Sequence, residues 1–211
     1  MPSIDQWKTT WSGLGVSITE SLLKDFEEII SRYSEPHRKY HTTRHLDECL
    51  AKLPDVSAFC EHPAEVELAL WFHDVIYDTR SHDNEARSAE LATAKLQSAG
   101  GLTETIERVA ALILATRHDA LPQNKDAQVV VDVDLSILGA NIERFDEYEK
   151  QIREEYFWVP ELLYRHERKK IMMEFLSRAS IFSTQLFRDR YEQQARGNIK
   201  RSIHNLSNSI F

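Results

Sequence analysis

A His-Asp dipeptide, His73-Asp74, lies in a strongly apolar stretch of the chain and is the pair best suited to chemistry. Val66, Leu70 and His73 fall at helical spacing, which predicts that the imidazole belongs to the apolar stripe of a helix. Asp74 follows Leu70 by one helical turn, so its carboxylate lies beside the same buried surface. A buried carboxylate needs a cation or several hydrogen-bond donors. An isolated pair of this kind is more often a core histidine beside a salt-bridged aspartate, so the other histidines and aspartates decide the interpretation.

Two further segments place candidate metal ligands on apolar helix faces. His45 shares its face with His41 and Cys49, which lie four residues before it and four residues after it. Asp134 has almost wholly apolar neighbours one helical turn away in both directions, whereas the neighbours of Asp132 are mixed. Because the more buried carboxylate needs a cation more, we predict that Asp134 is the ligand.

Together, His45, His73, Asp74 and Asp134 supply two imidazoles and two carboxylates. This donor set suits a divalent transition metal, Mn²⁺, Fe²⁺, Zn²⁺, Co²⁺ or Ni²⁺, with positions left for water and substrate. Ca²⁺ and Mg²⁺ prefer oxygen ligands alone and fit less well. Adjacent side chains on a helix point about 100° apart, so one ion bound by both His73 and Asp74 must lie between their tips, near a helix end.

The elements that must position these residues are predicted to be helices. Six glycines and six prolines among 211 residues favour helices with short connections. The segment 17–20, Ser-Ile-Thr-Glu, resembles a capping box and opens a long amphipathic helix that Pro36 interrupts. A second helix, which carries His45, is expected to stop at Pro54. A third, starting near Pro63, carries the His-Asp pair.

The rest of the chain is also predicted to be helical. Asp83 and Thr103 are credible N-caps of the next two helices, and Gly100-Gly101 ends the first of them. The segment 126–138 is ambiguous, because its three consecutive valines favour a strand. A lone strand in a helical chain has no partner, so we predict a buried helix there. Further helices are expected at 142–156, from Pro160 to about Arg178, and at about 184–196. The fold class is therefore all-α, a single domain over residues 1–211.

Charge and composition limit the partners and the compartment. With 26 basic and 34 acidic residues the net charge is −8, and no dense basic run offsets it. Binding of a nucleic acid polymer is therefore not expected, although a few arginines could hold a small phosphorylated substrate. The beginning of the chain has no apolar signal core, and no segment approaches the length of a membrane span. Cys49 and Cys60 form no paired framework, which favours a cytoplasmic protein without a membrane partner.

The order of the candidate ligands resembles a known signature. His45, then His73-Asp74, then Asp134 is similar to the H…HD…D pattern of the HD-domain superfamily of metal-dependent phosphohydrolases. Four longer segments resemble a less-characterised, predicted metal-dependent branch of it, over about residues 32–196: Tyr-His-Thr-Thr-Arg-His45, Leu-Trp-Phe-His-Asp-Val-Ile-Tyr-Asp78, Asn-Glu-Ala-Arg-Ser-Ala89 and Asp-Val-Asp-Leu-Ser-Ile-Leu-Gly139. The resemblance implies a helical bundle with a mononuclear metal site at those four ligands. It also implies hydrolysis of a phosphoester of a small molecule, usually a nucleotide or a similar compound.

Catalytic and substrate-binding residues are expected around such a site. Beside the ligand Asp74, either Asp78 or Glu85 could orient the activated water or protonate the leaving group. The alternatives are that Glu85 is a first-turn acid favoured by its helix dipole and that Asp78 is an ordinary loop residue. For the phosphate, Arg44 ranks first among several arginines, which include Arg38, because it directly precedes a ligand.

Two histidines complete the substrate-binding candidates. His118 ends an apolar helix and is expected to contact the substrate phosphate, to bind a second metal, or only to complement the helix dipole. His41 is expected either to line the cavity that holds the substrate or only to pack at the start of its helix.

Two other functions compete with the hydrolase. One is a regulatory domain that binds metal or nucleotide without turnover. The other is a di-iron oxygenase of the same fold, for which His82 and His118 would be extra ligands. A stripe through Met172 and Leu176 predicts either core or the interface of a homodimer.

Overall fold

The structure, a computed structural model that describes residues 2–208, is all-α as predicted, and no strand occurs within those residues. The ambiguous segment is helical: α8 (Lys125–Asp134) is followed by a 3₁₀ turn (Leu135–Gly139). Burial of the three valines, Val129 to Val131, therefore outweighs their local preference for a strand. The chain consists of two compact units, Met1–Asp134 and Leu135–Phe211. The single domain expected over residues 1–211 stays a prediction.

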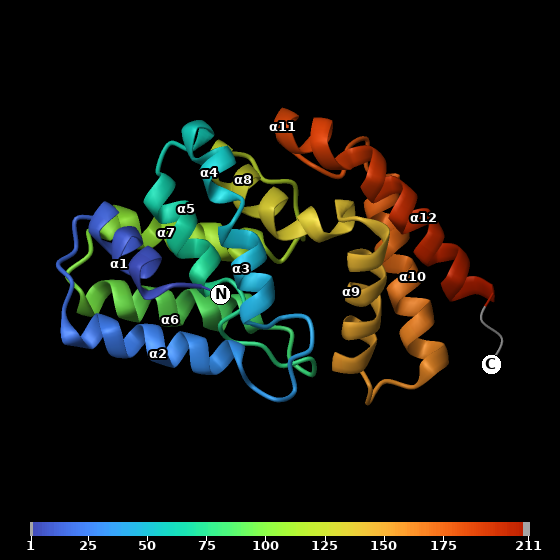
Figure 1. Cartoon of the computed structure of the whole chain (residues 1–211), viewed down its shortest axis with the longest axis horizontal. Coiled ribbons are helices and arrows are strands. Elements are labelled where there is room, and N and C mark those ends of the chain that lie inside the picture. Colours follow the sequence, from blue (N-terminus) through green and yellow to red (C-terminus); the bar gives the residue numbers. More distant parts are fainter. Residues whose placement is uncertain (1, 209–211) are drawn as a thin grey trace. The chain divides into compact units, whose positions relative to one another are not determined.

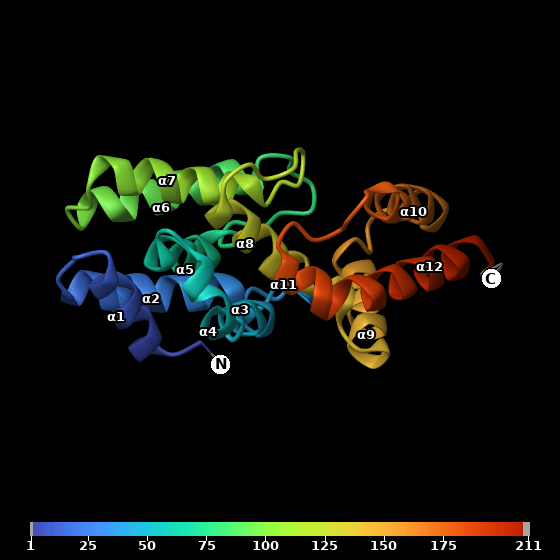
Figure 2. The same ribbon diagram turned by 90° about the horizontal axis from the view of Figure 1, so that it is seen from above.

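The first unit is organised around α5 (Pro63–Phe72). Its other elements are α1 (Ile4–Gly13), α2 (Glu20–Tyr33), α3 (Thr43–Leu50), α4 (Leu53–Val56), a 3₁₀ turn (Ser57–Phe59), α6 (Asn84–Ser98), α7 (Thr103–Ala115) and α8 (Figure 1). Five of these helices, α1, α3, α6, α7 and α8, pack on α5. Figure 2 shows α5 between the pair α6–α7 and the pair α1–α2. The helix that leads into His73 is thus the central one of this unit.

The sequence explains why α5 occupies this place. Every side chain from Leu68 to Phe72 is fully buried, as expected for a helix that is apolar on all sides. Asp126 fixes the start of the helix, because its carboxylate accepts the backbone N–H groups of Glu61 at 2.7 Å and His62 at 3.0 Å. A proline, Pro63, then occupies the first helical position, where it needs no N–H donor.

Several predicted helix ends are wrong. The cap of α2 is Thr19, whose hydroxyl accepts a backbone hydrogen bond of 3.3 Å from the first turn, and not Ser17. The helix that carries His45 ends at Leu50 because the chain turns into the short α4, which includes Pro54. The predicted stop after α6 is confirmed, since Gly100 has a φ of +76°, a conformation that glycine adopts without strain.

Two predicted N-caps also differ from those in the structure, and one helix of the structure was not predicted. Asp83 occupies the N-cap position of α6 but its side chain makes no capping bond, and Thr103 is the first residue of α7 rather than its cap. Helix α1 was not predicted. It is held by tertiary contacts: Trp7 packs edge-on against Trp71, with ring centroids 5.2 Å apart, and donates its indole N–H to Leu22 O at 2.9 Å.

The second unit is also helical. Its elements are the 3₁₀ turn, α9 (Ile142–Glu155), α10 (Glu161–Ser177), α11 (Gln185–Phe187), a π-helical turn (Arg188–Glu192) and α12 (Gln193–Asn208). Helix α12 extends well beyond the predicted end at Arg196 and packs along α10. Met172 is fully buried within this unit. In the described part of the chain, no helix has both the length and the apolar character needed to span a bilayer.

Candidate metal centre

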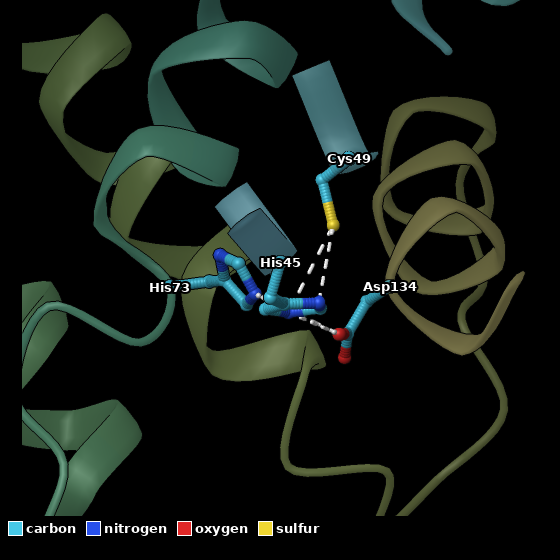
Figure 3. Close-up of side chains that lie close together, drawn as sticks. All are labelled: His45, Cys49, His73 and Asp134. Carbon is cyan, nitrogen blue, oxygen red and sulfur yellow. Dashed lines mark hydrogen bonds and ion pairs between the residues drawn. The ribbon is translucent and has the colours of Figure 1, made fainter. Parts of the chain in front are cut away.

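Four side chains from three separate segments of the first unit meet at one point. His45 Nε2 lies 3.0 Å from His73 Nε2. Asp74 Oδ2 lies 3.0 Å from His73 Nε2 and 3.3 Å from His45 Nε2. Asp134 Oδ1 lies 3.3 Å from His45 Nε2 and 3.6 Å from His73 Nε2. These are the four residues that the sequence predicted as ligands, and Figure 3 shows three of them, His45, His73 and Asp134, pointing toward one another.

The spacing of these atoms fits a single ion. A transition metal with nitrogen and oxygen ligands at about 2.1 Å separates neighbouring ligands by roughly 3.0 Å in octahedral and roughly 3.4 Å in tetrahedral geometry. The observed separations of 3.0 to 3.6 Å cover that range. Both imidazoles are almost completely buried. The group is therefore shaped to surround one small cation and to exclude most of the solvent.

The tautomer of His73 provides a second, independent indication. Its Nδ1 lies 2.8 Å from Leu70 O, so this nitrogen carries a hydrogen and donates it to the carbonyl. In the neutral ring Nε2 is then an acceptor, and it faces the carboxylate oxygens of Asp74 and Asp134, which are also acceptors. Acceptors that converge in a buried place need a cation between them. Metal-bound histidines are held by a backbone carbonyl in the same way.

The electrostatics of the group lead to the same conclusion. Burial lowers the pKa of His73, but the charge of Asp74 and further contacts outweigh it and raise this pKa well above its ordinary value. Burial raises the pKa of Asp74, but His73 and its other imidazole neighbours hold it well below its ordinary value. Burial also raises the pKa of Asp134, but its hydrogen bonds with His118, His45 and His73 outweigh this effect and hold that pKa well below its ordinary value. The site thus strongly favours positive charge, and a divalent ion would replace the protons that the imidazoles otherwise hold.

Because α5 ends at this point, the adjacent residues His73 and Asp74 can face one ion. His73 is the C-cap residue of α5, so Asp74 already lies beyond the helix. The guanidinium of Arg38, itself only 3% exposed, donates to Asp74 O at 2.7 Å and to Val75 O at 3.0 Å. It also stacks over the ring of Tyr33, 5.2 Å from the centroid. These bonds satisfy carbonyls that the helix end leaves without partners and fix the turn. The Nε of Arg38 also donates to the Glu35 carboxylate at 3.1 Å, so the guanidinium of Arg38 is already occupied, and the phosphate contact considered for it stays a prediction.

His118 supports Asp134 from the other side. Its Nε2 lies 3.0 Å from Asp134 Oδ2, the oxygen that does not face His45 and His73. His118 has a φ of +59°, a left-handed conformation that is uncommon outside glycine and in which histidine is enriched. This conformation, directly after α7, turns the ring toward the carboxylate. The structure thus places His118 against a ligand, which is a role that helix spacing alone did not predict.

The reason given for choosing Asp134 over Asp132 is wrong, although Asp134 is the residue that reaches the imidazoles. Asp132 is the more buried of the two, with 0% exposure, whereas 17% of the Asp134 side chain is exposed. A metal ligand in an active site must keep some access for solvent and substrate, so burial alone cannot rank the two carboxylates.

Cys49 is an additional member of the group. Its Sγ lies 3.8 Å from both ring nitrogens of His45 (Figure 3). Cys49, His45, His73 and Asp134 each offer a ligand atom, and these atoms all lie within 4.8 Å of one another. The sequence placed Cys49 on the face of His45 but did not identify it as a candidate ligand. Its spacing of one helical turn was the available signal.

The predicted acidic residues form no hydrogen bond or ion pair with this group. Asp78 is exposed and shapes a turn, because its carboxylate accepts the backbone N–H of Arg80 at 2.9 Å and its own N–H donates to Asn84. Glu85, in the first turn of α6, is half-buried, and its carboxylate makes no hydrogen bond or ion pair with residues 2–208. Neither is joined to the metal ligands, so their catalytic roles stay predictions.

Of the predicted substrate contacts, His41 lies beside a candidate ligand and Arg44 points to its own helix. Arg44 is exposed and donates to Glu48 at 3.1 Å on its own helix. His41 stacks on Tyr77 with a centroid distance of 4.1 Å, and its ring lies 5.7 Å from that of His45. His82, the extra ligand that an oxygenase would need, is exposed in the loop before α6.

Compared with protein family models, with curated proteins and with solved structures, the chain gives no match. The assignment of a candidate metal centre therefore rests on the geometry of its residues.

Proposed function

We propose that this protein is a metal-dependent phosphohydrolase that cleaves a phosphoester of a small molecule, such as a nucleotide. The observation that carries the proposal is the convergence of His45, His73, Asp74 and Asp134 on one point with the spacing of metal ligands. The order of these residues in the chain, which resembles that of HD-domain phosphohydrolases, supports it. In this proposal one Mn²⁺, Fe²⁺, Zn²⁺, Co²⁺ or Ni²⁺ ion is bound.

In this proposal, the residues around the ion have different roles. A bound divalent ion supplies an activated water and polarises a phosphoryl oxygen. Leu70 O keeps the proton of His73 on Nδ1, so that Nε2 stays available as a ligand. His118 fixes the second oxygen of Asp134 and prevents the carboxylate from rotating. The buried imidazoles keep other solvent away.

Glu85 is the first candidate for proton transfer. Its carboxylate has no partner among residues 2–208, so it is available to a substrate, whereas Asp78 already accepts a backbone hydrogen bond. A positioned carboxylate of this kind can take a proton from the attacking water or give one to the leaving group.

His41 and Arg44 are the candidates for binding the substrate. The stacked rings of His41 and Tyr77 lie beside His45 and offer a flat surface near the metal ligands. Arg44 could form a two-pronged contact with a phosphoryl group by exchanging its exposed bond to Glu48. Only a few side chains are candidates for binding the substrate, and such a site suits a small molecule. The net charge of −8 disfavours binding of a nucleic acid polymer.

The test is phosphate release from a panel of nucleotides and simple phosphoesters, with each of the five ions supplied in turn. Wild type should turn over at least one compound, and Asp74→Asn should not. Glu85→Gln should lower kcat with little change in metal content, while Glu90→Gln, an exposed residue of the same helix, should behave as wild type. Bound metal without turnover of any compound would overturn the hydrolase and favour a regulatory domain. Two iron ions per chain would favour the oxygenase.

A further inference from the structure

The thiol of Cys49 has surroundings that a core cysteine does not need. It is 2% exposed and lies 3.8 Å from both ring nitrogens of His45. The other cysteine, Cys60, makes the ordinary contact of a helical cysteine, with its Sγ 3.5 Å from Val56 O four residues earlier. Cys49 is thus directed toward a metal ligand, whereas Cys60 is directed toward its own backbone.

We infer that Cys49 is a thiolate ligand of the same ion and makes the site selective for thiophilic ions, Zn²⁺ and Co²⁺, over Mn²⁺ and Mg²⁺. This inference rests on the metal centre of the proposed function, and it adds a ligand of a different chemical class. A coordinating thiol gives up its proton, which leaves to solvent as the sulfur binds the ion.

The distances are compatible with this role. With a metal–sulfur distance of about 2.3 Å and a metal–nitrogen distance of about 2.1 Å, a sulfur and a nitrogen ligand lie roughly 3.6 Å apart at the tetrahedral angle. They lie slightly further apart at wider angles, so the 3.8 Å between Cys49 Sγ and His45 Nε2 fits. All the ligand atoms of Cys49, His45, His73 and Asp134 lie within 4.8 Å of one another. Two ligands on opposite sides of one ion lie at most about 4.4 Å apart, so the group has to close by a few tenths of an ångström to bind one ion with all four.

The selectivity follows from the nature of the donor atoms. His45, His73, Asp74 and Asp134 alone would accept most divalent transition metals, since imidazoles and carboxylates suit all of them. A thiolate favours soft and borderline ions and contributes little to the binding of Mn²⁺ or Mg²⁺. Cys49 would therefore decide among ions that the other four ligands do not separate.

The experiment is a Co²⁺ titration of the purified full chain, followed by absorption spectroscopy. Wild type should develop the visible bands of bound Co²⁺ together with an intense near-ultraviolet band from thiolate-to-cobalt charge transfer. Cys49→Ser should still bind Co²⁺ but lose the near-ultraviolet band. Cys60→Ser should keep both, and because the chain has two cysteines, the band in that variant can come from Cys49 alone. The ratio of Zn²⁺ affinity to Mn²⁺ affinity should fall by about tenfold or more in Cys49→Ser.

The outcomes separate this inference from the proposed function. Bound Co²⁺ without the near-ultraviolet band in wild type, or a band that persists in Cys49→Ser, would overturn the role of Cys49 and leave the metal centre intact. Failure of wild type to bind Co²⁺ at all would overturn both. If Cys49→Ser does not fold, as judged by circular dichroism, the spectrum of Cys60→Ser decides alone.

Discussion

In the second unit, the carboxylate of Glu149 is enclosed by donors that the chain itself supplies. Arg168 Nη2 lies 2.5 Å from Glu149 Oε1, and Ser202 Oγ donates to Glu149 Oε2 at 2.5 Å. In the first unit, the carboxylates of Asp74 and Asp134 instead face two imidazole nitrogens, and His73 Nε2 is a donor to them only while the ring holds a second proton.

The difference separates a structural ion pair from a ligand site. A buried carboxylate with a guanidinium beside it is neutralised, and further charge would be unfavourable there. A buried group of acceptors without a permanent cation is stable only when a proton or a metal ion joins it. The arrangement of donors around a carboxylate, rather than burial alone, therefore indicates where this protein binds an ion.

The largest effect should follow from breaking the structural pair. Arg168→Met leaves Glu149 without its cation and should lower the free energy of unfolding by about 3–5 kcal/mol, measured by urea denaturation. Arg168→Met combined with Glu149→Leu should recover much of this loss. The metal content of the folded protein should not change in either variant, and a loss of metal would contradict the distinction between a structural ion pair and a ligand site.

The metal centre should respond in the opposite way. Asp74→Asn should weaken metal binding by at least about 100-fold, because even outer partners of metal ligands contribute 10- to 100-fold. A chelator should lower the melting temperature of wild type, since bound metal stabilises the folded state, and should leave that of Asp74→Asn unchanged. The control is Asp78→Asn, which alters an exposed carboxylate in the turn after the ligand pair. Equal chelator sensitivity of Asp74→Asn and wild type would exclude Asp74 as a ligand.

A smaller effect is expected at the support of the ligand turn. Arg38→Lys cannot serve Asp74 O, Val75 O and His41 O at once, so the affinity for Zn²⁺, measured by competition with a chelator, should fall by about tenfold. Arg44→Lys, on an exposed residue nearby, should leave it unchanged. If Arg38→Lys bound metal normally but lost affinity for the phosphorylated substrate, Arg38 would be a phosphate contact after all.

The smallest effect concerns a carboxylate that backbone donors satisfy. Burial raises the pKa of Glu192, but the N–H groups of Ile181 and Phe182 and the charge of Arg196 outweigh it, so this pKa lies below its ordinary value. A lowered pKa means that the stabilisation is present above the unfolded pKa of about 4.3 and is lost as the pH falls through the folded pKa. Glu192→Gln should therefore be less stable than wild type at pH 7, by about 1 kcal/mol, and the difference should shrink below about pH 4. A constant difference across this range would contradict the account.

The sequence was sufficient where local pattern and tertiary packing agree. The apolar stretch before His73 predicted a buried helix, and that helix, α5, is the centre of its unit. The prediction of a helix at 126–138 depended on the absence of a partner strand and not on local helix propensity. Helix α1 was missed because its few apolar residues are explained only by the aromatic cluster around Trp71, which is distant in the sequence.

Around the candidate site, the sequence could supply residue types but not their partners. Arg38 looked like a phosphate contact because a guanidinium near histidines suggests one, yet two of its acceptors are carbonyl groups 36 and 37 residues away. His118 contacts Asp134 because of a left-handed backbone conformation that helix spacing does not encode. Cys49 could have been found, since it lies one turn from His45 on the same face.

The most direct test of the account is the metal content of the purified chain after it has been loaded with an ion and extensively dialysed. Wild type and Asp134→Asn would be compared by elemental analysis, with Glu90→Gln as the control. The account predicts close to one divalent transition metal ion per chain in wild type and in the control, and almost none in Asp134→Asn. Wild type that retains no Mn²⁺, Fe²⁺, Zn²⁺, Co²⁺ or Ni²⁺, or Asp134→Asn that retains as much as wild type, would contradict it.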